Sequence, residues 1–380
     1  MKCRPFASPI YVTKPILPDL DRFRQSLGDI WDSGWLTNNG RKHQELEKRL
    51  QTFLNVPALS LFNNGTIALI VALQSLDLKG EVITTPFTFP ASVHVLMWNR
   101  LTPVFCDIDP HTMNIDPRRM ESLITPRTTA ILGVHVYGTP CDVSAIDEIA
   151  DRHSLNVVYD SAHAFGVEID GQGIGKFGDM SMFSFHATKL FHTAEGGALA
   201  VNDAEAKARI DLLKNFGIRD EEQVILPGIN GKMNELQAAL GMAVLEEYEA
   251  EWRRRKALYE VYVSRLEGVD GLTLMHDDRR ITKASYQYFV VRIDEKVFGA
   301  SRDMIHEELK EYNIFTRKYF YPLCSQYDCY KDLPSAQAKK LPVANTVSRE
   351  VLCLPFYGAL RPDDVRQICD ILLSLRGATE

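Results

Sequence analysis

Lys189 has the residue type and neighbours of a reactive amine. It lies in the apolar stretch MFSFHATKLF, where burial would lower the pKa of the amine and favour its neutral form. A neutral amine is what a lysine needs to form an imine with a carbonyl group, although a lone lysine is more often a solvated surface charge. Gly196 and Gly197, which follow, would let something bulky approach the backbone closely.

Asp160 comes directly after the apolar run LNVVY, at the end of a predicted strand. Ligands of open α/β sheets bind outside the carboxyl ends of strands. The carboxylate would therefore face either a ligand cation or the start of a following helix. Taken alone, capping of a helix is the commoner role for such an aspartate.

The segment LFNNGTIALIVAL (61–73) predicts a turn that leads into a helix. Asn64, Gly65 and Thr66 would lie at the helix N-terminus, where free N–H groups and the helix dipole favour a phosphate. Capping of the helix by Asn64 or Thr66 fits the pattern equally well.

A phosphate site, a carboxylate and a lysine are together what pyridoxal phosphate requires. Its aldehyde bonds to the lysine, its phosphate is anchored, and the aspartate keeps its ring nitrogen protonated so that the ring accepts electrons. Phe89, in the segment PFTFPAS, could lie flat against the ring. The sequence therefore predicts an enzyme that uses pyridoxal phosphate.

Between residues 58 and 202, short apolar runs alternate with amphipathic stretches. Helix-like stretches such as 66–76 and 143–153 separate the runs, which favours a mostly parallel sheet with helices on both sides. Helical periodicity also marks 19–32 and 42–54. The runs are continuous rather than alternating, as in strands buried on both faces, and they cover 81–86, 103–109, 128–138, 155–160, 180–186 and 197–202.

The chain of 380 residues is long enough for one large and one smaller domain. Residues 234–266 are helix-like over a length that predicts a bend or break and an exit from the first domain. We expect a large cofactor-binding domain over 1–250, with the N-terminal segment, and a small C-terminal domain over 251–380. The smaller α/β unit has predicted strands at 286–294 and 351–356 and predicted helices at 301–312 and 362–375.

The composition narrows the class of protein. A net charge of −7 argues against general nucleic-acid binding, which needs a basic surface. The seven cysteines have irregular spacing and no CxxC pair, which indicates reduced thiols in a cytoplasmic chain. No signal peptide, membrane span or metal-binding histidine pattern is evident. The glycine-rich segment 171–178 predicts a hairpin turn rather than a phosphate loop.

Taken in order, these segments resemble the DegT/DnrJ/EryC1/StrS family of sugar aminotransferases over residues 8–375. The resemblance implies the aspartate-aminotransferase α/β architecture, the pyridoxal-phosphate fold type I, and a homodimer with shared active sites. The matching segments are SGWLTNNG, NNGTIAL, EVITTPFTFPAS, PVFCDID, HVYGTPCD, YDSAHAFG, GDMSMFSFHATK, EGGALAV, GINGKMNELQAALG and LCLPF.

The resemblance also implies roles for individual residues. Lys189 forms the imine with the cofactor and moves the proton, and Asp160 pairs with the ring nitrogen. His163 lies near the ring hydroxyl, and Phe89 stacks on the ring. Gly65, Thr66 and Ser184 hold the phosphate of the cofactor. Asn230 reaches the phosphate of the neighbouring subunit's cofactor.

Three positions depart from the commoner family residues. Asn64 stands where Ser is common, His163 where Gln is common, and Lys232 where Arg is usual. None of these changes removes a chemically required group. Related sugar dehydrases carry His at the position of Lys189, so the lysine favours transamination.

The segments WLTNNG, NNGTIAL, SFHATK and RKYFYPLC are most similar to enzymes that aminate C4 of a dTDP-linked 4-keto-6-deoxyhexose. The resemblance implies L-glutamate as donor and dTDP-4-keto-6-deoxy-D-glucose as acceptor, with pyridoxamine phosphate formed in the cycle. The product, dTDP-4-amino-4,6-dideoxyglucose, is a precursor for surface polysaccharide such as O-antigen. Amination at C3 and a non-catalytic regulator are the alternatives. The expected substrate-binding residues are Thr37, His186, Arg219, Arg317 and Lys318. Arg219, Arg317 and Lys318 are the candidate cations for the diphosphate.

Overall fold

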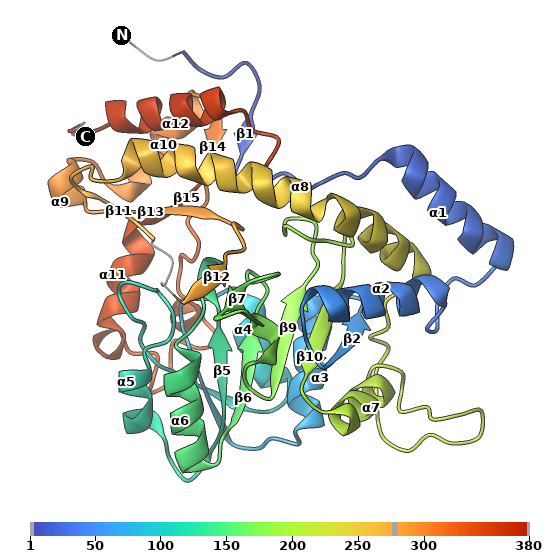
Figure 1. Ribbon diagram of the computed structural model, residues 1–380. Coiled ribbons are helices and arrows are strands. Elements are labelled where there is room, and N and C mark those ends of the chain that lie inside the picture. The colour runs from blue at the N-terminus through green and yellow to red at the C-terminus, as the bar shows by residue number, and fades with distance from the viewer. Residues whose placement is uncertain (1–3, 276–279, 378–380) are drawn as a thin grey trace.

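The computed structural model describes residues 4–275 and 280–377. Its centre is a sheet of seven strands among these residues, in the order β2-β10-β9-β6-β5-β3-β4 (Figure 1). Within the sheet, β10 alone runs antiparallel to its neighbours, so the sheet is mostly parallel, as predicted. The strands are β2 (Ala58–Phe62), β3 (Glu81–Thr84), β4 (Thr102–Phe105), β5 (Thr128–Val134), β6 (Asn156–Asp160), β9 (Met180–Ser184) and β10 (Gly197–Val201).

Helices cover both faces of this sheet, which explains why its strands are continuous apolar runs. Alternate side chains of each strand enter two separate cores, one on each face. One core includes α3 (Gly65–Ser75), α4 (Pro90–Trp98) and α7 (Ala204–Leu213). The other includes α2 (Arg41–Phe53), α6 (Val143–His153) and the first half of α8 (Glu235–Leu266).

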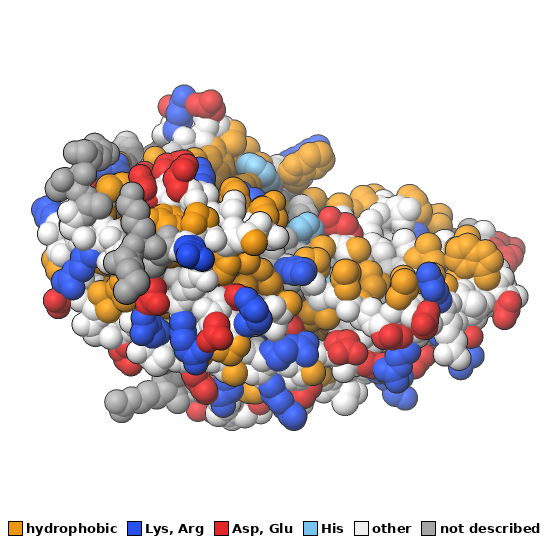
Figure 2. All heavy atoms as spheres, turned by 90° about the horizontal axis from the view of Figure 1, so that it is seen from above, with side chains coloured by type: hydrophobic (Ala, Val, Ile, Leu, Met, Phe, Trp, Pro, Cys, Tyr) orange, Lys and Arg blue, Asp and Glu red, His pale blue; other side chains and the backbone are white. Residues whose placement is uncertain are grey.

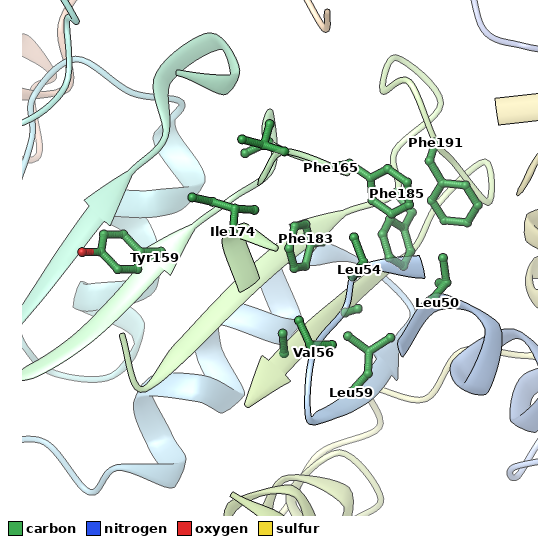
Figure 3. Packing of buried hydrophobic residues seen from close by; sticks show 14 of the residues in the cluster. Leu50, Leu54, Val56, Leu59, Tyr159, Phe165, Ile174, Phe183, Phe185 and Phe191 are labelled. Carbon is green, nitrogen blue, oxygen red and sulfur yellow. The ribbon is translucent and has the colours of Figure 1, made fainter. Parts of the chain in front are cut away.

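Aromatic side chains anchor the segment that follows β9 (Figure 3). Phe165 stacks on Phe191 with ring centroids 4.6 Å apart, and Phe185 meets Phe191 edge-on at 4.8 Å. Each such pair adds roughly 0.5–1.5 kcal/mol beyond the burial of its area. Because Phe185 precedes the loop 186–190 and Phe191 follows it, the core holds both ends of the loop that carries Lys189.

The helix α8 is continuous over 32 residues, so the prediction of a bend or break in it is wrong. At 1.5 Å per residue it is about 48 Å long. Met242 and Tyr248 in its first half pack in the core of the large sheet. Leu258 and Leu266 in its second half pack in the C-terminal core. The helix persists because each half has its own apolar partner, and Figure 1 shows it crossing between the two.

A second, smaller sheet follows α8, and it confirms the predicted strands and helices of the C-terminal region. It consists of β11 (Leu272–Leu274), β13 (Phe289–Ile293) and β15 (Val351–Leu354). The helices of this region are α9 (Glu295–Phe298), α10 (Arg302–Glu311), α11 (Pro342–Glu350) and α12 (Pro362–Ser374). A domain boundary at residue 250 would fall inside α8, and it stays a prediction.

The N-terminal segment contacts both parts of the chain. β1 (Ile10–Tyr11) pairs with β14 (Ile314–Phe315) of the C-terminal region, whereas Ile16 belongs to the core of the large sheet. After it, α1 (Leu20–Ser33) lies against α8 at one end of the molecule (Figure 1).

The glycine-rich segment begins in a hairpin, as predicted. β7 (Glu168–Ile169) and β8 (Gln172–Gly173) pair antiparallel around Asp170 and Gly171, which both have positive φ. β12 (Ile281–Lys283) pairs with β7. The short helix α5 (Pro117–Met120) contacts α6.

The described residues bear on three further expectations. Their six cysteines are free, and Cys3 lies outside the described residues. No helix in the described ranges is long and apolar enough to cross a membrane. Over the same ranges, no three or more His, Cys, Asp or Glu side chains gather as metal ligands would.

A buried ion pair fixes α8 to the C-terminal region. Arg255 donates to Glu251 at 2.8 Å, and the two side chains are only 1% and 6% exposed. Glu251 also accepts a bond from the N–H of Gly358 at 2.8 Å, and Arg255 donates to the carbonyl of Tyr286 at 3.3 Å. Removal of Glu251 would leave the Arg255 charge buried without its carboxylate, whereas Glu251 also pairs with Arg254 at 3.1 Å.

We predict that Glu251→Ala lowers the free energy of unfolding by about 3–5 kcal/mol, because it leaves the Arg255 charge buried and uncompensated. Glu249→Ala is the matched control on the same helix. It removes an exposed ion pair with Arg253 at the same four-residue spacing and should cost less than about 1 kcal/mol. Urea unfolding followed by tryptophan fluorescence measures both losses, and equal losses would contradict the prediction.

Candidate functional site

A cavity of about 230 Å³ opens at the carboxyl ends of the large-sheet strands. β2, β3, β6 and β9 all point the same way, so the residues directly after them meet there. The predicted site residues that line this cavity are Gly65, Thr66, Phe89, Asp160, His163, Ser184, His186 and Lys189.

Lys189 is the reactive amine of this cavity. It lies in the loop after β9, where its backbone N–H donates to the carbonyl of His186 at 2.9 Å. Burial lowers the pKa of the amine to about 8, while the carboxylate of Asp160 acts in the opposite direction. With such a pKa, roughly one amine in ten is neutral at pH 7, so it can act as nucleophile and as base.

Asp160 ends β6 and is fixed by two hydrogen bonds. Its Oδ2 accepts from the hydroxyl of Ser92 at 2.7 Å, and its Oδ1 accepts from the N–H of Ala162 at 3.0 Å. Burial raises the pKa of the carboxyl, and the two bonds and the Lys189 charge oppose that rise. Between β6 and β7, a fully described stretch, there is no helix, so the helix-capping interpretation of Asp160 is wrong.

Two buried hydroxyls that were not predicted from the sequence support Asp160. Thr88 and Ser92 lie with their oxygens 2.8 Å apart. Ser92 gives its single hydrogen to Asp160, so Thr88 must be the donor to Ser92. The four-residue spacing of Thr88 and Ser92 at the start of a helix is a signal that could have found them.

The start of α3 has the hydrogen-bonding capacity of an anion site. Asn64 caps the helix by accepting the N–H of Ile67 at 2.8 Å, so the capping interpretation is correct for Asn64. Among the residues that the structure describes, no group accepts from the N–H groups of Gly65 and Thr66. Both residues line the cavity together with the hydroxyl-bearing Ser184. Two free N–H groups at a helix start favour a phosphate.

Glycines bring this helix start against the sheet. A Cβ on Gly65 would lie 2.9 Å from the sulfur of Met182, and one on Gly197 would lie 2.7 Å from the nitrogen of Gly65. A Cβ on Gly196 would overlap the Thr193 hydroxyl. Gly196 and Gly197 therefore do permit a close approach to the backbone, and the atoms that approach belong to the chain itself.

His163 is a neutral donor in the cavity wall. Its Nδ1 accepts from the N–H of Tyr137 at 3.2 Å, and burial together with the Lys189 charge holds the pKa of the ring well below its usual value. The hydrogen of the neutral ring is then on Nε2. The ring lies parallel to that of Phe320 at 5.9 Å and edge-on to that of Tyr288 at 5.0 Å.

The C-terminal region supplies one wall of the cavity through Tyr288, Tyr319 and Phe320, none of which was predicted as a site residue. They are about 100 residues or more beyond Lys189 in the chain, so no local pattern marks them. The ring of Phe89, which also lines the cavity, is 56% exposed, which leaves it free to cover a flat ligand.

His186 and Glu195 lie at the mouth of the cavity. His186 Nε2 is 3.7 Å from the carboxylate of Glu195, and His186 Nδ1 is 2.9 Å from the hydroxyl of Thr188. All three side chains line the opening. Glu195 was not predicted from the sequence, although it precedes the two glycines directly.

Five predicted residues do not line the cavity in this chain: Thr37, Arg219, Asn230, Arg317 and Lys318. Thr37 and Arg219 are exposed on loops, and Lys318 is paired with Asp303 at 2.9 Å. Their roles stay predictions, as do those of Asn230 and Arg317.

The chain is similar to known proteins over nearly its full length. The sequence profile of the DegT/DnrJ/EryC1/StrS aminotransferase family matches residues 19–373. The dTDP-4-amino-4,6-dideoxy-D-glucose transaminase of Escherichia coli is 48% identical over 96% of this chain and 98% of that protein.

Solved structures support the same fold. DesI, solved in the presence of its TDP-sugar product, has a TM-score of 0.93 and 37% identity over 98% of this chain and 94% of its own. The putative sugar aminotransferase Spr1654 of Streptococcus pneumoniae, in its PMP form, has a TM-score of 0.89 and 26% identity, with 97% of each chain covered.

We predict that Asp160→Asn lowers the pKa of Lys189 by about one unit in cofactor-free protein, because it removes the anion that stabilises the ammonium form. Competitive acetylation of Lys189 across a pH series, read by mass spectrometry, measures this pKa. Asp170→Asn, at an exposed hairpin position, is the control and should change nothing. An unchanged pKa in the Asp160 variant would show that the two groups do not interact.

Proposed function

Because the chain belongs to the DegT/DnrJ/EryC1/StrS aminotransferase family, we propose that it transfers the amino group of L-glutamate to C4 of dTDP-4-keto-6-deoxy-D-glucose. The product is dTDP-4-amino-4,6-dideoxyglucose, made in the cytoplasm. The observation that carries the proposal is the cavity in which Lys189, with its lowered pKa, meets the buried carboxylate of Asp160. The Escherichia coli relative, named for this amino sugar, supports the choice of substrate.

Pyridoxal phosphate is the proposed cofactor, because each of its polar groups finds a partner among the cavity residues. The free N–H groups of Gly65 and Thr66 and the hydroxyl of Ser184 suit the phosphate. The Asp160 carboxylate suits a protonated ring nitrogen, and the neutral His163 ring suits the ring oxygen. The relative solved in its PMP form supports this choice.

When bound, pyridoxal phosphate supplies a carbonyl that takes up the amino group and a ring that withdraws electrons. Asp160, held by Ser92 and Ala162, keeps the proton on the ring nitrogen. The Nζ of Lys189 removes the α-proton of glutamate and later returns a proton to C4 of the sugar. A pKa near 8 suits both tasks, because proton transfer is most efficient when the pKa lies near the working pH.

The diphosphate of the substrate needs cations beyond the cavity. Arg317 is exposed and close to Tyr319, whose pKa it lowers against the effect of burial. It therefore lies near the cavity wall. Lys318 is already paired with Asp303, so we favour Arg317 within this chain. Arg219 lies on the segment between α7 and α8, and we assign it to a second subunit's substrate.

A homodimer is the proposed assembly. Hydrophobic side chains gather at the end of the molecule that α1 forms (Figure 2), and Trp31, Trp35 and Leu36 are each more than half exposed. Exposed apolar patches of this kind mark protein interfaces. The segment between α7 and α8 also extends from the body (Figure 1), and it carries Asn230 and the exposed side chain of Phe216. Such a segment suits contact with a second copy.

We predict that the purified protein converts glutamate and dTDP-4-keto-6-deoxy-D-glucose into 2-oxoglutarate and a C4-amino sugar. NMR of the product fixes the aminated carbon. Lys189→Ala should abolish turnover, because the amine that moves the proton is lost. The exposed Lys79→Ala is the control and should keep wild-type turnover. A C3-amino product would support the regiochemical alternative, and no turnover on dTDP-, UDP- or GDP-keto sugars would support a regulator.

We predict that mixed dimers of Lys189→Ala and Asn230→Ala subunits regain activity, although each variant alone is inactive or weak. If Asn230 serves the neighbouring subunit's site, every mixed dimer has one wholly native site and one doubly altered site. If Asn230 serves its own site, no native site forms. Titration of one variant with the other, with turnover measured at each ratio, separates the two cases.

A further inference from the structure

One side chain from the C-terminal region holds the backbone on both sides of Lys189. Gln287 is 2% exposed. Its Oε1 accepts from the N–H of Leu190 at 2.7 Å, and its Nε2 donates to the carbonyl of Thr188 at 3.1 Å. The two bonds therefore hold the residues immediately before and after Lys189. None of the roles assigned above uses Gln287.

The chemistry of this contact requires a carboxamide. The loop presents one donor at Leu190 and one acceptor at Thr188, and a glutamine carries one acceptor and a donor group in a single plane. A carboxylate would keep only the acceptor, and an apolar side chain would keep neither. Because the site is buried, an unmade bond there costs the full desolvation of the backbone group.

Gln287 is itself fixed by α8. Arg255 donates through Nη1 to the carbonyls of Tyr286 and Gln287, at 3.3 and 3.5 Å. The buried carboxylate of Glu251 holds Arg255 in turn. The aromatic rings at Phe185 and Phe191 hold the ends of the lysine loop, whereas Gln287 supplies polar partners for its middle.

The next residue, Tyr288, lines the cavity. Gln287 and Tyr288 are adjacent, so one short segment both lines the cavity and holds the backbone on either side of Lys189. Through this segment, the distance between the amine and the substrate-facing wall is set by the C-terminal region rather than by the large sheet alone.

We propose that Gln287 is a positioning residue that keeps the Lys189 amine in line with the reacting carbon. Its effect on turnover rests on the function proposed above. The amine must stay within reach of that carbon while it is free, and a displacement of about 1 Å can cost roughly 100-fold in rate. Positioning of this kind governs the chemical step and leaves substrate affinity largely unchanged.

The test compares Gln287→Met, which keeps the volume of the side chain and loses both bonds, with the wild-type holoenzyme. Two results are expected. Amide hydrogen exchange at Leu190, resolved by fragmentation mass spectrometry, accelerates at least about tenfold. The kcat falls by about 10- to 100-fold while KM for glutamate and for the keto sugar stays within about threefold. Gln326→Met is the control, since Gln326 also bonds a backbone N–H and a side chain, but neither of these partners belongs to the loop 186–190.

A second variant keeps the proposal testable if Gln287→Met does not fold. Gln287→Glu keeps the acceptor for Leu190 and loses the donor for Thr188. It should therefore protect the Leu190 amide like the wild type and still lose at least about threefold in kcat. A folded Gln287→Met protein with wild-type kcat overturns the proposal, as does a Gln287→Glu protein with wild-type kcat at a pH where the new carboxyl is ionised, or wild-type exchange at Leu190 in the methionine variant. If the wild-type chain aminates no sugar, the proposed function fails, whereas the exchange experiment still decides whether Gln287 holds the loop.

Discussion

The placement of an ammonium group and a carboxylate in one buried cavity is the constraint on which the rest of the structure depends. Burial makes both charges costly, and it moves the two pKa values in opposite directions, down for Lys189 and up for Asp160. Hydrogen bonds from Ser92 and Ala162 favour the carboxylate form of Asp160 against the effect of burial, while burial makes the Lys189 amine easier to deprotonate. The cationic ring nitrogen of the proposed cofactor would complete this balance, because it would give the buried carboxylate a partner.

The parts of the site that follow directly after strands could be predicted from the sequence. Asp160, Ser184 and Lys189 each come at or shortly after the end of an apolar run, and a parallel sheet brings such ends together. The start of α3 could be predicted for a similar reason, since its turn residues precede a helical pattern. For these residues, the local sequence pattern predicts where the side chain lies, and its place in the site indicates its chemical role.

The parts that depend on packing could not be predicted in the same way. Gly196 and Gly197 predict a close approach to the backbone, but only packing determines that the approaching atoms are the Thr193 hydroxyl and the backbone at Gly65. The length of α8 predicts a break, yet two separate cores keep it whole. Tyr288 and Phe320 reach the cavity only because the C-terminal region folds back over the large sheet, and nothing in their own neighbourhood in the sequence indicates it.

The two proposed substrates differ in whether they need residues outside the cavity. The described cavity residues meet the requirements of the cofactor, and the three cations expected for a diphosphate all lie outside the cavity lining. Under the proposed function, recognition of the nucleotide would therefore belong to the rim and to a second subunit, whereas the chemistry would belong to the interior of one chain. Glutamate carries no nucleotide, so it would use only the interior. A site arranged in this way can accept glutamate and the nucleotide sugar in turn and use the same lysine for both. The nucleotide, which only one of them carries, would be bound outside the cavity.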